Sequence, residues 1–254
     1  MDVRVCMYAI YRWTKTKYVY NLQMDLKDRE IAERLKATIP APLHPHMRFL
    51  LLLREPIARD LSQYNHMRAH NNVKMLCPET KADMKTGDYN QHLAKKLKCR
   101  QEERSCSKCL LAQTRRGNYA SQLKWWFEHF APHQFLVLNS MMMYDSDSRS
   151  AAPALRAVGE FLGLGGSKWE EMVAEGFPHS NDGAFSSKVE WVKYVFGEID
   201  AEVCNDYLKL IAQDNTDLYR LLEEMRPKMS RLQPPFLPFP ENPCEKAQGR
   251  PHPV

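Results

Sequence analysis

The chain has 254 residues, of which 44% are hydrophobic and 26% charged, and its formal net charge is +5. This composition is that of a globular protein, and the length allows one α/β domain, or two small ones, with a substantial core. The mild positive charge fits an anionic ligand and does not indicate nucleic acid, and no apolar run approaches the roughly 18 residues that a membrane-spanning helix needs.

The first part of the chain, up to residue 46, gives few local signals. Residues 3–11 have the composition of a strand, and residues 26–37 place apolar side chains at helical spacing. Three prolines between residues 40 and 45 then indicate a loop. No glycine occurs in the first 46 residues, so this region does not contain a glycine-rich phosphate-binding loop.

The strongest local pattern lies between residues 47 and 70. Phe49–Leu53 is an uninterrupted apolar run of strand length, which indicates a parallel strand buried on both faces. Arg54 follows this strand, and Pro56 favours the first turn of a helix. Helix N-termini attract anions through their free N–H groups and the positive end of the helix dipole. The pattern therefore predicts an anion site where the strand meets the helix.

The helix predicted after residue 56 has an apolar stripe and a separate polar face. The stripe consists of Ile57, Leu61 and Tyr64. The polar face carries Arg59, Ser62 and His66, which are three and four residues apart. We expect the stripe to pack on the core and the polar face to lie near the anion site.

Residues 70–116 form a polar, basic insertion, after which regular elements resume. A helix is predicted from residue 119, ending before Pro132, then a strand at residues 134–138 and helices at residues 151–162 and 203–225. Eight of the sixteen prolines lie between residues 227 and 253, which predicts an extended or disordered tail. The chain is therefore interpreted as one α/β domain, residues 1–226, followed by a tail at residues 227–254.

Four of the seven cysteines cluster in the insertion, at Cys77, Cys99, Cys106 and Cys109. The Cys106-x-x-Cys109 pair could supply half of a zinc site with His92, but no second close pair follows. We therefore expect no metal and predict disulfides within this group, as in proteins of a secretory compartment. The sequence leaves their connectivity open.

The pattern Arg54-x-Pro56-x-x-Arg59-x-x-Ser62-x-Tyr64 resembles the 3′-phosphate-binding motif of sulfotransferases. The continuation to His66 is similar to heparan sulfate N-sulfotransferases, and later segments resemble chondroitin 6-O-sulfotransferases. The resemblance implies a P-loop-like fold, in which a parallel sheet is flanked by helices. It also implies transfer of a sulfo group from 3′-phosphoadenosine 5′-phosphosulfate (PAPS), used as a co-substrate, to a carbohydrate.

The resemblance also implies roles for single residues. Arg54 and Ser62 have the family spacing for holding the 3′-phosphate, and His66 corresponds to a position that lines the acceptor side, where it is the candidate catalytic base. Lys188 is the nearest cation to a later loop that contacts the nucleotide in the family. The lysines and arginines of the insertion suit an anionic glycan acceptor, although a solvated charge run explains them equally well. Family analogy places the protein in the Golgi lumen.

One part of the family pattern is missing from this sequence. Sulfotransferases normally open with a strand, a lysine- and glycine-bearing loop that cradles the phosphosulfate, and a helix. We therefore expect the fold to be N-terminally incomplete or the protein to be a divergent, inactive member. Two alternatives to an active sulfotransferase remain: a relative that binds nucleotide or sulfated glycan without transfer, and an unrelated basic α/β binding module.

Overall fold

The computed structural model describes residues 7–13, 16–22, 29–69, 77–79, 87–140, 142, 148–163 and 199–239. The strands are β1 (Met7–Trp13), β2 (Thr16–Leu22), β3 (Arg48–Leu53) and β4 (Phe135–Asn139). The α-helices are α1 (Arg29–Thr38), α2 (Pro56–Ala69), α4 (Tyr89–Gln101), α5 (Lys108–Thr114), α6 (Tyr119–His129), α8 (Ser148–Phe161) and α10 (Ala201–Met225). Short 3-10 turns are η1 (Ala41–His46), η3 (Glu103–Ser105), η4 (Arg115–Gly117), η5 (Pro132–Gln134) and η7 (Arg226–Lys228).

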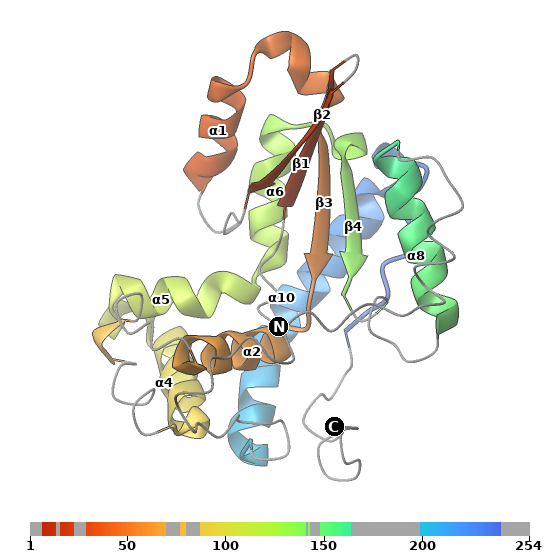
Figure 1. Cartoon of the computed structure of the whole chain (residues 1–254). Coiled ribbons are helices and arrows are strands. Elements are labelled where there is room, and N and C mark those ends of the chain that lie inside the picture. The colour runs from red at the N-terminus through yellow and green to blue at the C-terminus, as the bar shows by residue number, and fades with distance from the viewer. Residues whose placement is uncertain are drawn as a thin grey trace.

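The described strands form one mixed sheet in the order β2-β1-β3-β4 (Figure 1). The central pair, β3 and β4, is parallel, with Phe49 opposite Phe135 and Leu53 opposite Asn139. The predicted α/β class with a parallel pair flanked by helices is therefore present. The expectation of a parallel sheet does not extend to the start of the chain, because β1 runs antiparallel to both β2 and β3. Only two residues separate β1 from β2, too few for the crossover that parallel neighbours require.

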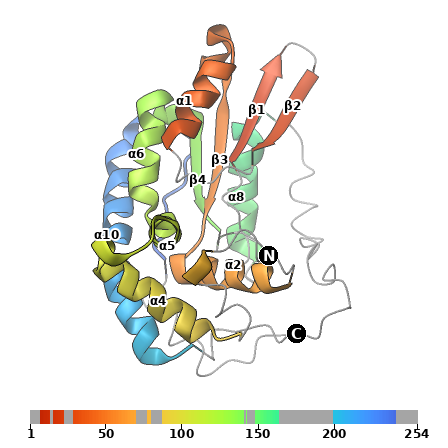
Figure 2. The same ribbon diagram turned by 90° about the vertical axis from the view of Figure 1, so that its left-hand side faces the viewer.

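Helices cover both faces of the β3–β4 pair (Figures 1 and 2). On one face, Phe49, Leu51 and Leu53 pack with α1, α6 and the second half of α10. On the other face, Leu50 packs with β4 and α8. Because successive side chains of a strand point to opposite faces, β3 contributes buried side chains to both faces, although Leu52 on the Leu50 face is only half-buried.

A second apolar cluster lies beyond the carboxyl ends of β3 and β4. The apolar stripe of α2, predicted from the sequence, packs there against α4 and the first half of α10, which Figure 2 shows on the same side of the molecule. Its buried members are Ile57, Leu61, Tyr64, Tyr89, Leu93, Ile199, Cys204, Tyr207 and Ile211. This cluster fixes α2 at the end of the sheet where ligand sites of open α/β sheets form.

The basic insertion contains α4 and α5, which two disulfides brace. Cys99 at the end of α4 is joined to Cys106, and Cys77 is joined to Cys109 in α5. The prediction of disulfides within this group of cysteines is confirmed, and the structure supplies the connectivity. Within the described part of the chain, no group of three candidate ligands could hold a metal ion.

The segment after α10 differs from the tail expected there. Up to Phe239 it packs on the core, with Met229 and Phe239 buried. The Gln233 side chain accepts a hydrogen bond from the Val137 N–H at 2.8 Å and donates one to the Val137 carbonyl at 2.7 Å. Prolines disfavour helix and ladder formation but not packing, so residues 229–239 form no regular helix or strand and still pack on the core; residues 240–254 lie outside the described residues. None of the described helices combines the length and apolarity needed to cross a bilayer.

Candidate functional site

The turn that follows β3 is held from two directions. The N–H of Ser140, just after β4, donates to the Leu53 carbonyl at 2.7 Å, and the Tyr119 hydroxyl donates to the Arg54 carbonyl at 2.8 Å. Gly117 lies against the first residue of α2, since a Cβ added there would sit only 2.9 Å from the Cβ of Pro56. These contacts fix the backbone of Arg54 and the start of α2 at the carboxyl edge of the parallel pair.

The N-terminus of α2 is occupied by a carboxylate of the chain itself. Glu55 accepts hydrogen bonds from the N–H of Ile57 at 3.0 Å and from the N–H of Ala58 at 2.6 Å. Its side chain is buried, and burial raises its pKa to about 7, although both N–H groups and the charges of Arg54 and Arg59 act in the opposite direction. An external anion would therefore have to rely on side chains near this helix start, and not on these two N–H groups.

The two residues with the predicted phosphate spacing flank this capped turn. Arg54 lies between β3 and α2, and Ser62 lies in the second turn of α2; both are partly exposed. Six residues of helix from Pro56 to Ser62 rise about 9 Å, a distance that an extended arginine side chain and a phosphate together can span. Neither residue lines the pocket between α2 and α4 or the pocket beside η7.

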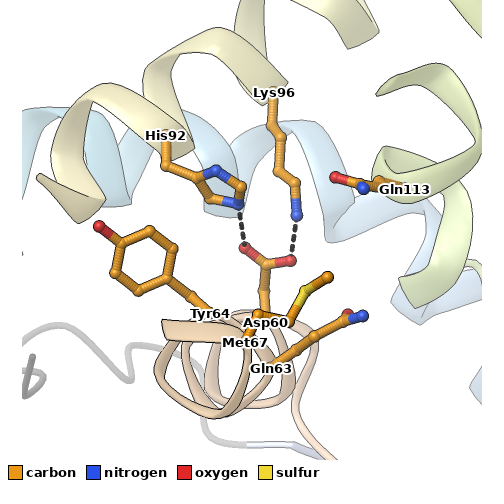
Figure 3. Close-up of a pocket in the computed structure, with 7 residues that line it drawn as sticks. All are labelled: Asp60, Gln63, Tyr64, Met67, His92, Lys96 and Gln113. Carbon is orange, nitrogen blue, oxygen red and sulfur yellow. Dashed lines mark hydrogen bonds and ion pairs between the residues drawn. The ribbon is translucent and has the colours of Figure 1, made fainter. Parts of the chain in front are cut away.

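On the side of α2 that packs against α4 lies a buried charged residue, Asp60, which the sequence analysis did not single out. Asp60 is 3% exposed and forms an ion pair with Lys96 of α4, which is also 3% exposed. The Tyr89 hydroxyl donates to the same carboxylate at 3.2 Å, and the Nε2 atom of His92 lies 3.9 Å from it. Figure 3 shows His92 and Lys96 reaching down from α4 to the two oxygens of Asp60.

The electrostatics of this cluster keep one carboxylate ionised. Burial has the largest single effect and raises the pKa of Asp60, but the charge and hydrogen bond of Lys96 and the charges of neighbouring groups together outweigh burial and lower that pKa to about 2. Burial, followed by the charge of Lys96, lowers the pKa of His92 to about 3, so His92 is neutral near pH 7. Burial raises the pKa of Tyr89 well above its ordinary value. The cluster is thus a charged pair surrounded by neutral polar groups.

A small pocket borders the Asp60 cluster. Its other lining residues are Gln63, Tyr64, Met67 and Gln113 (Figure 3). It has space for about one water molecule, which is far too little for a nucleotide or a sugar. The Nδ1 atom of His92 is buried and has no hydrogen-bond partner within the described part of the chain. The arrangement therefore resembles an internal support more than a substrate cavity.

Some of the basic side chains in the insertion form ion pairs. Arg100 of α4 contacts Asp214 of α10 at 2.7 Å, and Asn118 donates to the other oxygen of Asp214 at 2.8 Å. Arg115 contacts Glu103 at 2.7 Å. These pairs connect α4 to α10 and η4 to η3, and they reduce the positive charge that the insertion offers to an anionic partner.

The chain was compared with models of protein families and with curated protein sequences. A scan of the chain against models of protein families found no match. A search of curated protein sequences also found no match. The resemblance of the Arg54–Tyr64 motif to sulfotransferases therefore stays a prediction, and the function has to be argued from the residues themselves.

The structure brings together only part of the predicted site. Arg54 and Ser62 share one strand–turn–helix unit, whereas His66 lies one turn further along α2, and its side chain lies outside the described residues. Lys188 is outside the described residues altogether. The sequence did contain a signal for Asp60, because a carboxylate at this position interrupts the apolar stripe of α2. Its partner Lys96, however, is 36 residues away and cannot be identified from local spacing.

Proposed function

We propose that this protein is a PAPS-dependent sulfotransferase that acts on a carbohydrate acceptor. One observation supports this proposal above the others: Arg54 and Ser62 lie on a single turn and helix at the carboxyl edge of the parallel β3–β4 pair. This edge is where open α/β sheets bind ligands. The spacing of Arg54 and Ser62 and their place at the edge of the sheet are separate observations, and both support a phosphate site there.

Arg54 and Ser62 are suited to a phosphate monoester. A guanidinium group offers two parallel N–H donors to phosphate oxygens, and a serine hydroxyl adds a third donor from the helix. Because Glu55 caps the N–H groups of Ile57 and Ala58, recognition would depend on these side chains. Removing one charged contact of this kind weakens binding by about 10- to 100-fold.

The reaction would transfer a sulfo group to a glycan hydroxyl or amine. A base takes the proton from the acceptor, the acceptor atom forms a bond to sulfur, and the bond from sulfur to the bridging oxygen breaks. Adenosine 3′,5′-bisphosphate leaves. His66 is the candidate base in this proposal, since imidazole titrates near neutral pH and belongs to the same helix as Ser62.

Calorimetric titration with two nucleotides tests the binding half of this proposal. The wild-type protein should bind adenosine 3′,5′-bisphosphate more tightly than adenosine 5′-monophosphate. The Arg54→Ala and Ser62→Ala variants should lose this preference, whereas Arg220→Ala, which removes an exposed charge from α10, should keep it. Equal affinity of the folded wild-type protein for both nucleotides would contradict the assignment.

Transfer of labelled sulfate from PAPS to desulfated glycans tests the chemical half. Binding of the bisphosphate without transfer would favour a second candidate function, a protein that binds nucleotide or sulfated glycan. Two observations favour this candidate: residues 1–46 contain no glycine, and β1 beside β3 runs antiparallel. A phosphosulfate loop of the usual kind requires glycine and follows a parallel strand.

A further inference from the structure

The buried contact between α2 and α4 concentrates three polar groups of one helix on a single carboxylate of the other. Lys96, Tyr89 and His92 of α4 all approach Asp60, and the Lys96 and Asp60 side chains are each 3% exposed (Figure 3). Apolar packing already exists around this contact, from Ile57 and its neighbours in the same cluster. The apolar contacts therefore already hold α2 against α4, and the polar contacts to Asp60 come in addition to them.

A buried ion pair adds little net stability to the contact between two helices. Two charges lose their hydration when they are buried, and well-packed apolar residues in their place are often equally stable or more stable. The polar contacts instead restrict the rotation of α2 about its own axis. Apolar burial is non-directional and tolerates small rotations, whereas hydrogen bonds and ion pairs to two defined oxygens depend strongly on angle and distance.

The rotation of α2 that Asp60 fixes also determines where the polar face of α2 points. Each helical residue turns by about 100°, so Asp60 and Ser62 are about 200° apart around α2. Holding Asp60 against α4 therefore directs Ser62 away from α4. A rotation of α2 by only about 20° would move a side-chain atom on the helix surface by about 2 Å, which is enough to break a hydrogen bond to a phosphate oxygen.

The helix that supplies these groups is itself fixed. Cys99, at the end of α4, is disulfide-bonded to Cys106, and Arg100 contacts Asp214 of α10 at 2.7 Å. The next turn toward the start of α4 carries Lys96. Thus α4 is a stable reference against which the rotation of α2 can be set.

We propose that Lys96 and Asp60 are positioning residues: their buried ion pair, together with the hydrogen bond from the Tyr89 hydroxyl, sets the rotation of α2 at which Ser62 and the neighbouring Arg54 bind a nucleotide 3′-phosphate. This inference rests on the proposed function, since it assumes a 3′-phosphate ligand. It assigns no direct ligand contact to Asp60 or Lys96. It assigns them control over how well the protein distinguishes nucleotides with and without a 3′-phosphate.

A double substitution tests this role apart from stability. Asp60→Asn together with Lys96→Met removes both charges and keeps an acceptor for the Tyr89 hydroxyl. The matched control is Asp206→Asn with Lys209→Met, the same exchange at an exposed ion pair on α10. Thermal unfolding of both variants is measured, and affinities for adenosine 3′,5′-bisphosphate and adenosine 5′-monophosphate are measured by calorimetry.

The expected result is a folded double variant whose preference for the bisphosphate falls by about tenfold, because the ligand groups are misplaced by an ångström or more. The control should keep the wild-type preference. A folded double variant with the wild-type preference would overturn the proposal. If the wild-type protein has no preference, the proposed function fails first, and this inference fails with it.

A second, milder variant covers the case in which the double variant does not fold. Tyr89→Phe removes only the hydroxyl that donates to Asp60, and it preserves the aromatic packing with Tyr64. We expect the preference for the bisphosphate to fall by about threefold while the protein stays folded. An unchanged preference in Tyr89→Phe would also overturn the proposal.

Discussion

Glu55 should make the stability of the protein depend on pH in a way that Glu55→Gln abolishes. The pKa of the Glu55 carboxyl rises from 4.5 to about 7 on folding, with burial as the main cause. Between these values the unfolded chain releases the proton and the folded chain retains it, so the free energy of unfolding decreases as pH rises. The full shift corresponds to about 3.4 kcal/mol, of which about 2.5 kcal/mol falls between pH 5 and pH 8. This contribution is present below pH 4.5 and is lost as pH rises through 7.

Urea unfolding at pH 5, 6, 7 and 8, with the disulfides oxidised and ionic strength constant, measures this effect. The glutamine of Glu55→Gln is neutral throughout and still offers one acceptor to the N–H groups of Ile57 and Ala58. Relative to this variant, the wild-type protein should lose about 2.5 kcal/mol from pH 5 to pH 8. Glu224→Gln, an exposed exchange on α10, is the control and should follow the wild-type curve. Parallel curves for wild type and Glu55→Gln would refute the reasoning.

Three further predictions concern the elements around the site. Lys96→Met alone leaves the Asp60 carboxylate buried without its ion-pair partner and should lower the free energy of unfolding at pH 7 by about 3–5 kcal/mol; a loss below about 1 kcal/mol would show that the pair is solvated. Replacing both cysteines of Cys77–Cys109 by serine should cost about 4 kcal/mol, against about 2 kcal/mol for Cys99–Cys106, because the first closes the longer loop; urea unfolding with the opposite order would contradict this. Gly117→Ala should cost about 1–3 kcal/mol and lower Tm, since the added methyl group meets the start of α2 at 2.9 Å; an unchanged Tm would mean that this contact yields freely.

Local patterns in the sequence predicted most of the elements around the site. The run Phe49–Leu53 indicates a strand buried on both faces, and the structure places β3 there, covered by helices on each side. Helical spacing predicted residues 203–225, and α10 covers Ala201–Met225. Such elements are predictable because the pattern that reveals them also makes them pack.

Features that depend on distant partners could not be predicted in this way. The direction of β1 depends on its pairing with β3, about 40 residues later in the chain, and no periodicity within β1 encodes it. The clustering of four cysteines predicted disulfides, but the pairing Cys77–Cys109 and Cys99–Cys106 required the geometry. In the candidate site, the spacing of Arg54 and Ser62 can be identified from the local sequence. The partners of Asp60 cannot, because they lie on α4, which is distant in the chain.

The Gln233 amide has a consequence for how this protein behaves in solution. Among the described strands, β4 is the last of the sheet on its side, and an open edge of this kind can pair with a strand of another molecule. Gln233 satisfies both the N–H and the carbonyl of Val137, as a neighbouring strand would, and Asn139 donates to the Leu237 carbonyl at 2.9 Å. We therefore expect the segment after α10 to hinder self-association, and we expect shortening the chain to residue 228 to leave the backbone of Val137 open to pairing with a strand of another molecule.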